Sequence, residues 1–254
     1  MSEEKQQDTF ISHLIELRVR LIRAIIAVLL VFLGLVNWAR DIYTLLAQPM
    51  LAALPQGGHM IATDVAGAFF VPMKVTLMVS FLIALPYVLY QAWSFVAPGL
   101  YASERKLTAP LLVASVILFF IGMSFAFFVV FPTVFVFVNK FAPEGVSVMT
   151  DIDKYLSFVM TTFLAFGVTF EVPVVVIVLV KTGLVTVDKL REIRPYVIVG
   201  AFVVGAIFTP PDILSQFLLA VPLCLLYEAG IIVASLLVKE SATKSKSTEL
   251  AHKK

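Results

Sequence analysis

Six long apolar runs alternate with short polar connectors along most of the chain. The runs cover about 22–39, 69–92, 107–138, 155–180, 195–208 and 213–238. A helix of about 20 apolar residues crosses the hydrocarbon core of a bilayer, and it satisfies its own backbone hydrogen bonds. The pattern therefore predicts an all-α membrane protein with six transmembrane helices, in a single domain over 1–238.

Two of the runs have unusual lengths, and several contain proline. Run 107–138 would form a helix of about 48 Å, so it must tilt, bend at Pro132 or project beyond the bilayer. Run 195–208 reaches only about 21 Å, which thins the membrane locally or hides the helix among its neighbours. Further prolines lie at Pro72, Pro86, Pro110, Pro173 and Pro222. A kinked bundle is expected, because each proline frees a backbone carbonyl.

The composition fits this interpretation and leaves little room for anything else. Hydrophobic residues make up 60% of the 254 positions and charged residues 14%, so a soluble fold could not bury the apolar surface. The one cysteine, Cys224, excludes an internal disulfide. The segment 239–254 is rich in Ser, Lys and Thr, and it is predicted to be a disordered tail.

The basic residues divide unequally between the two sides of the membrane. Fifteen Lys and Arg residues fall in the two tails and in the connectors on the same side, against Arg40, Lys140 and Lys154 on the other side. By the positive-inside rule both termini are cytoplasmic. On the outer side, the apolar spacing from Ile42 to Met50, which includes Pro49, predicts a short amphipathic helix at the interface.

The sequence lacks the common signatures of an enzyme. It has no Gly-rich phosphate loop, no nucleophile elbow, and no His, Cys or carboxylate cluster with metal-ligand spacing. We expect no enzymatic activity, no metal and no cofactor.

Among the ionisable residues within the runs, Glu171 lies closest to the middle of the membrane. A charged side chain at that depth costs about 2.5–3.5 kcal/mol. Glu171 either is protonated and bonded to carbonyls freed near Pro173, or it faces a polar cavity. Thr209 and Gln216, at the outer ends of the last two runs, can hydrogen-bond a further helix in the membrane. Helix capping near Pro210-Pro211-Asp212 is the competing interpretation for Thr209 and Asp212.

Two carboxylates on the cytoplasmic side lie near aromatic residues. Glu16 precedes the first run. Glu104 follows a predicted turn at Pro98-Gly99, and Phe95 lies just before that turn. This set suits a ligand with guanidinium groups followed by an apolar stretch, since each Arg–carboxylate pair contributes about 1.5–3 kcal/mol where partly dehydrated. The alternative is that both acids pair with surface arginines of this chain, namely Arg18, Arg20 and Arg105.

Several ordered motifs resemble those of the TatC family, the multi-span receptor subunit of the twin-arginine protein translocase. They are His13-Leu14-Ile15-Glu16-Leu17-Arg18, the segment from Trp93 to Arg105, Phe166-Gly167-Val168-Thr169-Phe170-Glu171-Val172-Pro173, Arg194-Pro195-Tyr196, and Thr209-Pro210-Pro211-Asp212 with Ser215-Gln216. The match covers almost the entire chain and is closest to the type found in Gram-negative enterobacteria.

The resemblance implies a concave, glove-like bundle of six helices with short fifth and sixth helices, in the bacterial inner membrane. It implies a receptor that binds twin-arginine signal peptides and exports folded proteins with the proton-motive force, together with single-span TatA- and TatB-type partners and further copies of itself. The residues to which it gives roles are Glu16, Phe95, Leu100, Glu104 and Arg105 for the signal peptide, Glu171 for the concave cavity, Thr209 and Gln216 for docking the partner helices, and Pro49 for the outer rim.

A proton-coupled small-solute transporter, with Glu171 as the relay, is the alternative function. The sequence shows no internal repeat and few intramembrane polar residues, which argues against it. A passive assembly scaffold is a third possibility.

Overall fold

The structure is a computed structural model, and it describes most of the chain. The backbone is described over 2–53, 61–64, 66–96, 108–140, 151–209 and 212–252. Side chains are described over 11–48, 61–64, 66–95, 109–137, 151–209 and 212–238.

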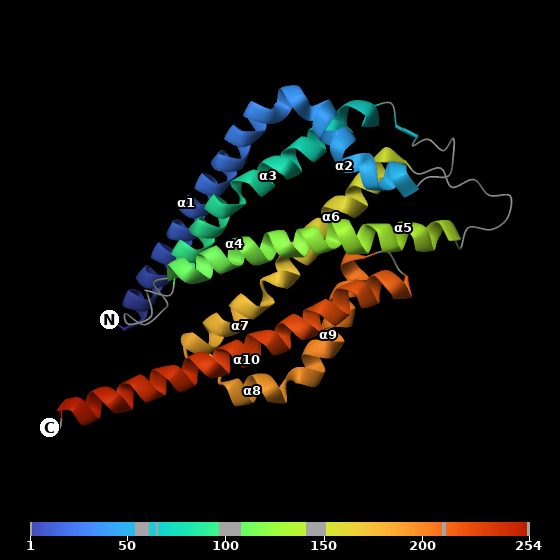
Figure 1. The fold of residues 1–254 in the computed structure, drawn as a ribbon. Coiled ribbons are helices and arrows are strands. Elements are labelled where there is room, and N and C mark those ends of the chain that lie inside the picture. The colour runs from blue at the N-terminus through green and yellow to red at the C-terminus, as the bar shows by residue number, and fades with distance from the viewer. Residues whose placement is uncertain are drawn as a thin grey trace. The chain divides into compact units, whose positions relative to one another are not determined.

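Regular structure within these ranges is helical apart from one isolated bridge between Ile61 and Asp151. The elements are α1 (Ser2–Leu35), η1 (Val36–Trp38), α2 (Ala39–Ala53), α3 (Gly67–Val96), α4 (Thr108–Phe125), η4 (Ala126–Val130), α5 (Phe131–Lys140), α6 (Ile152–Phe170), α7 (Val172–Lys181), α8 (Val187–Glu192), α9 (Arg194–Phe208) and α10 (Ile213–His252). Figure 1 shows their course. They fall into two compact units: Met1–Gly99, Arg105–Val116 and Phe131–Met160 form the first, and Leu100–Glu104, Ile117–Val130 and Thr161–Lys254 the second.

The helix lengths confirm a multi-span protein. Within the described ranges, five helical stretches are long and apolar enough to cross a membrane: Ile11–Gln48, Gly67–Phe95, Ala109–Phe137, Ile152–Lys181 and Ile213–Val238. The short fifth helix expected from the sequence is α9, which has 15 residues. The expected short sixth helix is wrong, because its apolar part alone has 26 residues. Pro222 lies inside α10 without ending it.

Both chain ends extend further as helix than the hydrophobic pattern predicts. Helix α1 begins at Ser2, about twenty residues before the first apolar run. Helix α10 runs to His252, through the segment for which the sequence predicts a disordered tail. That segment contains no Gly or Pro. Its Lys, Glu and Ala residues favour helix, so an established helix can propagate through it.

In the first unit, α1 and α3 lie side by side and α2 packs against α3 (Figure 1). The core here consists of Val71 and Val75 from α3 with Leu156 from α6. The α2 residues Ile42 and Leu46 pack on this core. The amphipathic helix predicted between the first two runs is therefore confirmed, and its apolar face holds it against α3.

The long third run is interrupted where the sequence predicts a bend. A π-helical turn, η4, separates α4 from α5, and Pro132 is the second residue of α5. Proline has no N–H to give to the carbonyl four residues earlier, and π-helical turns redistribute the hydrogen bonds around such a gap.

In the second unit, glycines allow close helix packing. A Cβ on Gly122 of α4 would lie 2.6 Å from the carbonyl oxygen of Phe166 on α6. Gly167, the next residue of α6, is covered in the same way by the ring of Phe119. Each helix thus offers a glycine to a phenylalanine of the other, the small-residue packing by which membrane helices approach closely.

Candidate functional site

Glu16 lies on α1, and its side chain is 36% exposed. Arg20, one helical turn later, donates from Nε and Nη2 to the Glu16 Oε1 at 2.9 and 2.5 Å. His13, one turn earlier, places its Nδ1 4.0 Å from Oε2. The interpretation in which Glu16 pairs with a neighbouring arginine of this chain is confirmed for Arg20. Glu16 therefore holds a guanidinium group at an accessible position.

Phe95 connects this part of α1 to the end of α3. Its ring stacks on the imidazole of His13, with the ring centroids 4.1 Å apart and the planes at 21°. Trp93, two residues earlier, donates from Nε1 to the hydroxyl of Ser115 on α4 at 3.1 Å. The start of α1, the end of α3 and α4 are thus joined by side chains around Phe95.

His13 is the residue of this region that the sequence reasoning missed. It precedes Glu16 by three positions, so the two side chains lie on one face of α1. That spacing, together with an aromatic residue at the end of the neighbouring helix, could have indicated His13 as a neighbour of Glu16 and Phe95. The stacked imidazole of His13 places the ring of Phe95 one helical turn from Glu16 on α1.

The other three predicted residues of the peptide site, Leu100, Glu104 and Arg105, lie outside the described residues. Glu104 follows Phe95 by nine positions in the sequence. The pairing of Glu16 with Glu104 around one ligand stays a prediction.

Glu171 marks the break between α6 and α7. It is half-buried and precedes Val172, with a φ of −76° and a ψ of −14°. Its N–H bonds to the Val168 carbonyl at 3.0 Å, a tighter turn than in an α-helix. Pro173 then opens α7 with its fixed φ. The local proline chemistry thus explains where Glu171 lies, and its functional role stays a prediction.

Thr209 and Gln216 both use polar groups within the pair α9 and α10. Gln216 donates from Nε2 to the Phe202 carbonyl of α9 at 2.8 Å. Thr209 ends α9 and donates from its hydroxyl to the Gly205 carbonyl at 2.8 Å. A Cβ on Gly205 would lie 3.0 Å from the Gln216 Cγ, so the glutamine lies directly over this glycine. Thr209 thus caps the end of α9, and the docking of a partner helix near Thr209 and Gln216 stays a prediction.

Pro49, predicted for the outer rim, lies within the bounds of α2, and its side chain is outside the described ones.

Within the described residues, no group of three or more His, Cys, Asp or Glu side chains gathers in a way that could hold a metal ion.

An unpredicted ion pair joins α9 to α10. The Arg194 Nη2 lies 2.6 Å from the Glu228 Oε2. Next to it, the hydroxyl of Tyr227 donates to the Leu190 carbonyl of α8 at 2.8 Å. Glu228 therefore has a structural partner, and α10 is tied to both α8 and α9 at this end.

Comparison with known proteins identifies the family. Residues 12–222 match the family model described as "Sec-independent protein translocase protein (TatC)". The chain is 57% identical to the Sec-independent protein translocase protein TatC of Escherichia coli K12 over 231 residues, covering 91% of this chain and 89% of that protein. It is 51% identical to the TatC protein of Haemophilus influenzae over 234 residues, covering 92% and 91%.

A solved structure agrees with the sequence matches. The crystal structure titled "Twin Arginine Translocase Receptor- TatC" superimposes with a TM-score of 0.77 at 40% identity, over 88% of this chain and 98% of that one. As a translocase component, the chain is a transport protein and not an enzyme. The chain belongs to the TatC family, and it is a multi-pass membrane subunit of the bacterial Sec-independent, twin-arginine protein translocase.

Proposed function

We propose that this subunit is the receptor for twin-arginine signal peptides, and that Glu16 and Glu104 bind the paired arginines. The likeness to a solved structure described as a twin-arginine translocase receptor supports this most directly, and the Arg20 pair indicates that Glu16 can hold a guanidinium group. The acid already makes the charge-assisted bonds that an arriving arginine would need. Because the Arg20 side chain belongs to an i, i+4 surface pair worth about 0.3–0.5 kcal/mol, a peptide arginine can displace it at little cost.

The aromatic residues suit the part of the peptide that follows the arginines. Phe95 is half-buried and stacked on His13. Ile15 and Leu17, next to Glu16 on α1, are 58% and 43% exposed. An apolar stretch of the signal peptide can lie on these side chains. We assign Leu100 and Arg105 to the same site.

The remaining assignments follow the family. We propose that both termini are cytoplasmic, that the helices form a kinked, concave bundle with Glu171 facing its cavity, and that Pro49 shapes the outer rim. Single-span TatA- and TatB-type helices dock near Thr209 and Gln216. Further copies of the subunit join the complex, and the proton-motive force supplies the energy, about 2.3 kcal/mol per charge per 100 mV.

Photo-crosslinking tests the peptide site. A crosslinking side chain at Ile15, in membranes that contain the partner subunits, is exposed to a signal peptide with Arg-Arg or with Lys-Lys. Lysine keeps the charge and loses the planar fork of donors, so the Arg-Arg peptide should give the larger adduct yield. Glu16→Gln and Glu104→Gln should each weaken binding about tenfold or more, since a charged hydrogen-bonded pair contributes about 1.5–3 kcal/mol.

Glu192→Gln is the matched control. Glu192 is also a surface acid paired with a base in its own helix, since its Oε2 lies 3.0 Å from the Lys189 Nζ. Its replacement should leave the adduct unchanged. Equal adduct yields with Arg-Arg and Lys-Lys peptides would remove the receptor assignment and favour a scaffold or a small-solute transporter.

A further inference from the structure

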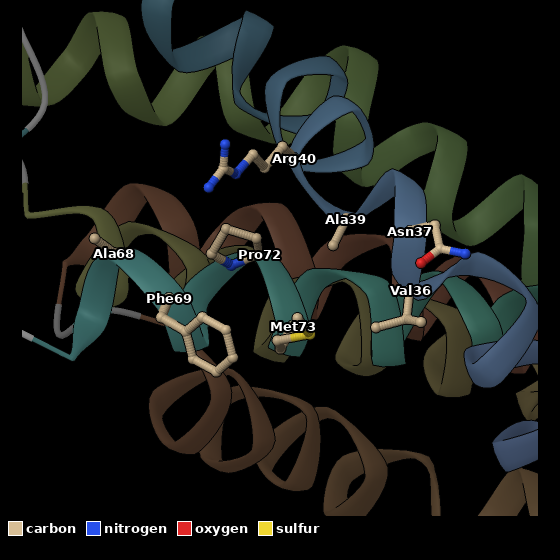
Figure 2. A pocket seen from close by; sticks show the side chains of 8 residues that line it. All are labelled: Val36, Asn37, Ala39, Arg40, Ala68, Phe69, Pro72 and Met73. Carbon is tan, nitrogen blue, oxygen red and sulfur yellow. The ribbon is translucent and has the colours of Figure 1, made fainter.

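A cavity lies at the junction of α1 and α2, beside the start of α3. Its volume is about 550 Å³, within the range of about 300–1,000 Å³ for small-ligand sites. The turn η1 contributes Asn37, α2 contributes Arg40, and α3 contributes Phe69, Pro72 and Met73. Figure 2 shows the Arg40 side chain extending from α2 in the direction of α3. All of these residues belong to the first compact unit.

The side chains next to the cavity are typical of the boundary between membrane and water. Trp38, next to Asn37, is 56% exposed, and tryptophan gathers at the headgroup level of bilayers. Phe69 and Phe70 are 62% and 54% exposed, and such exposed aromatic side chains are typical of a surface that contacts lipid. The wall formed by Phe69 and Met73 is thus apolar, whereas the opposite wall carries the charge of Arg40.

Arg40 has no acidic partner within the described part of the chain. Lys74, which follows Met73 on α3, does have one: its Nζ lies 2.5 Å from the Asp153 Oδ1. An arginine that borders an apolar wall gains from an anion, because partial dehydration strengthens their attraction. The planar guanidinium group matches phosphate oxygens with two parallel N–H donors.

We propose that this cavity binds the phosphoryl headgroup of an anionic phospholipid. Arg40 supplies the counter-charge through the planar fork of its N–H donors. The acyl chains lie on Phe69 and Met73. A free phosphate ion would satisfy Arg40 alone and leave that apolar wall without a partner. A phospholipid satisfies both walls, and the bilayer presents it at this depth.

Fluorescence quenching tests the proposal on the full-length protein in a non-ionic detergent. The chain has two tryptophans, so Trp93→Phe leaves Trp38 as the only reporter beside the cavity. The probes are phosphatidylglycerol with brominated acyl chains, which quench tryptophan on contact, and diacylglycerol with the same chains and no phosphate. We expect phosphatidylglycerol to quench Trp38 at a concentration about tenfold lower, the size of one charge-assisted interaction.

Variants of Arg40 link the quenching to the cavity. Arg40→Gln should raise the half-quenching concentration of phosphatidylglycerol by about fivefold or more, and Arg40→Lys by less, since lysine keeps the charge without the fork. Arg23→Gln, an exposed arginine of α1, is the matched control and should change nothing. Circular dichroism confirms that each variant is helical, and Arg40→Lys serves if Arg40→Gln does not fold.

Three outcomes would overturn the proposal. Equal quenching by phosphatidylglycerol and diacylglycerol, or quenching that is unchanged in both Arg40 variants, would show that the phosphoryl group is not recognised here. Competition by inorganic phosphate separates the two sources of the anion. If millimolar phosphate displaces the brominated lipid as well as short-chain phosphatidylglycerol does, the cavity binds a free anion and the lipid assignment fails.

Discussion

The carboxylate of Asp151 accepts hydrogen bonds from both the backbone N–H and the hydroxyl of Thr63, at 3.0 and 2.6 Å. These bonds to Oδ2 join residues 88 positions apart. Oδ1 accepts from the backbone N–H groups of Asp153 and Lys154, at 2.9 and 3.0 Å, and so caps the start of α6. One side chain therefore fastens the segment before α3 to the first turn of α6.

These contacts predict an acid-sensitive element of stability. The Thr63 hydroxyl, followed by the backbone N–H groups, holds the pKa of Asp151 well below its ordinary value. Since the folded pKa is lowered, the stabilisation is complete above the unfolded pKa of about 4 and is lost as the pH falls through the folded value. Asp151→Asn should lower the thermal midpoint in detergent at pH 7, and this difference should shrink progressively below about pH 4.

Two comparisons check the origin of that effect. Thr63→Val should destabilise the protein as well, and adding it to Asp151→Asn should cost less than the sum of the single changes. Asp188→Asn, at an acid whose side chain is 92% exposed, should leave the midpoint unchanged. A difference between Asp151→Asn and the parent protein that is the same at pH 3 as at pH 7 would contradict the assignment.

The glycine contacts between α4 and α6 give a second prediction. Gly122→Ala should destabilise the protein by about 1–3 kcal/mol, because the new Cβ meets the backbone oxygen of Phe166, which no side-chain rotation can move. Gly34→Ala is the matched control, since nothing lies within 4 Å of its Cβ position. Alanine favours helix over glycine by about 1 kcal/mol, so this control should be neutral or stabilising. Chemical denaturation in mixed micelles measures both variants, and equal effects would disprove close packing at Gly122.

The positions of the helices were predictable because the bilayer imposes a strong constraint on sequence. An apolar run of about 20 residues has essentially one structure in a membrane, so the runs predict the spans and the shortness of α9. A proline lacks an N–H, so Pro132 and Pro173 predict irregular backbone near 126–130 and at Glu171. Both follow from local chemistry.

Contacts between distant segments were not predictable in the same way. The bond between Thr63 and Asp151 and the ion pair between Arg194 and Glu228 depend on which helices become neighbours. The periodicity of a single sequence does not indicate which helices pack against each other. The polar start of α1 was missed for a different reason: its helical signal depends on pairs such as Glu16 and Arg20, which hydropathy does not record.

The pair Arg194 and Glu228 gives a third prediction, testable by a double-mutant cycle. Both side chains are partly exposed, at 43% and 40%, so solvent weakens their attraction. We expect a coupling free energy of about 0.5–1 kcal/mol from Arg194→Gln, Glu228→Gln and the double variant. The more exposed pair Lys189 and Glu192, at 57% and 68%, should couple less strongly. A coupling no larger than that of this control pair would mean that Arg194 and Glu228 do not stabilise α10 against α9.

The last prediction depends on the proposed docking of single-span partners near α9 and α10. Gln216→Leu keeps a similar volume over Gly205 and removes the bond to the Phe202 carbonyl. A polar contact between membrane helices contributes about 0.6 kcal/mol on average and about 1.7 at most, so a TatB-type partner should co-purify about three- to fifteenfold less well.

A matched variant separates docking from damage to the subunit. Ser235→Ala, also on α10, removes a hydroxyl that bonds to the carbonyl of Ile232 in its own helix, and it should not change the amount of partner. The thermal midpoint of Gln216→Leu without the partner reports how far the contact between α9 and α10 has loosened. A loss of partner much larger than this destabilisation means that the glutamine acts on the partner helix directly. Unchanged co-purification would place the docking surface on other residues.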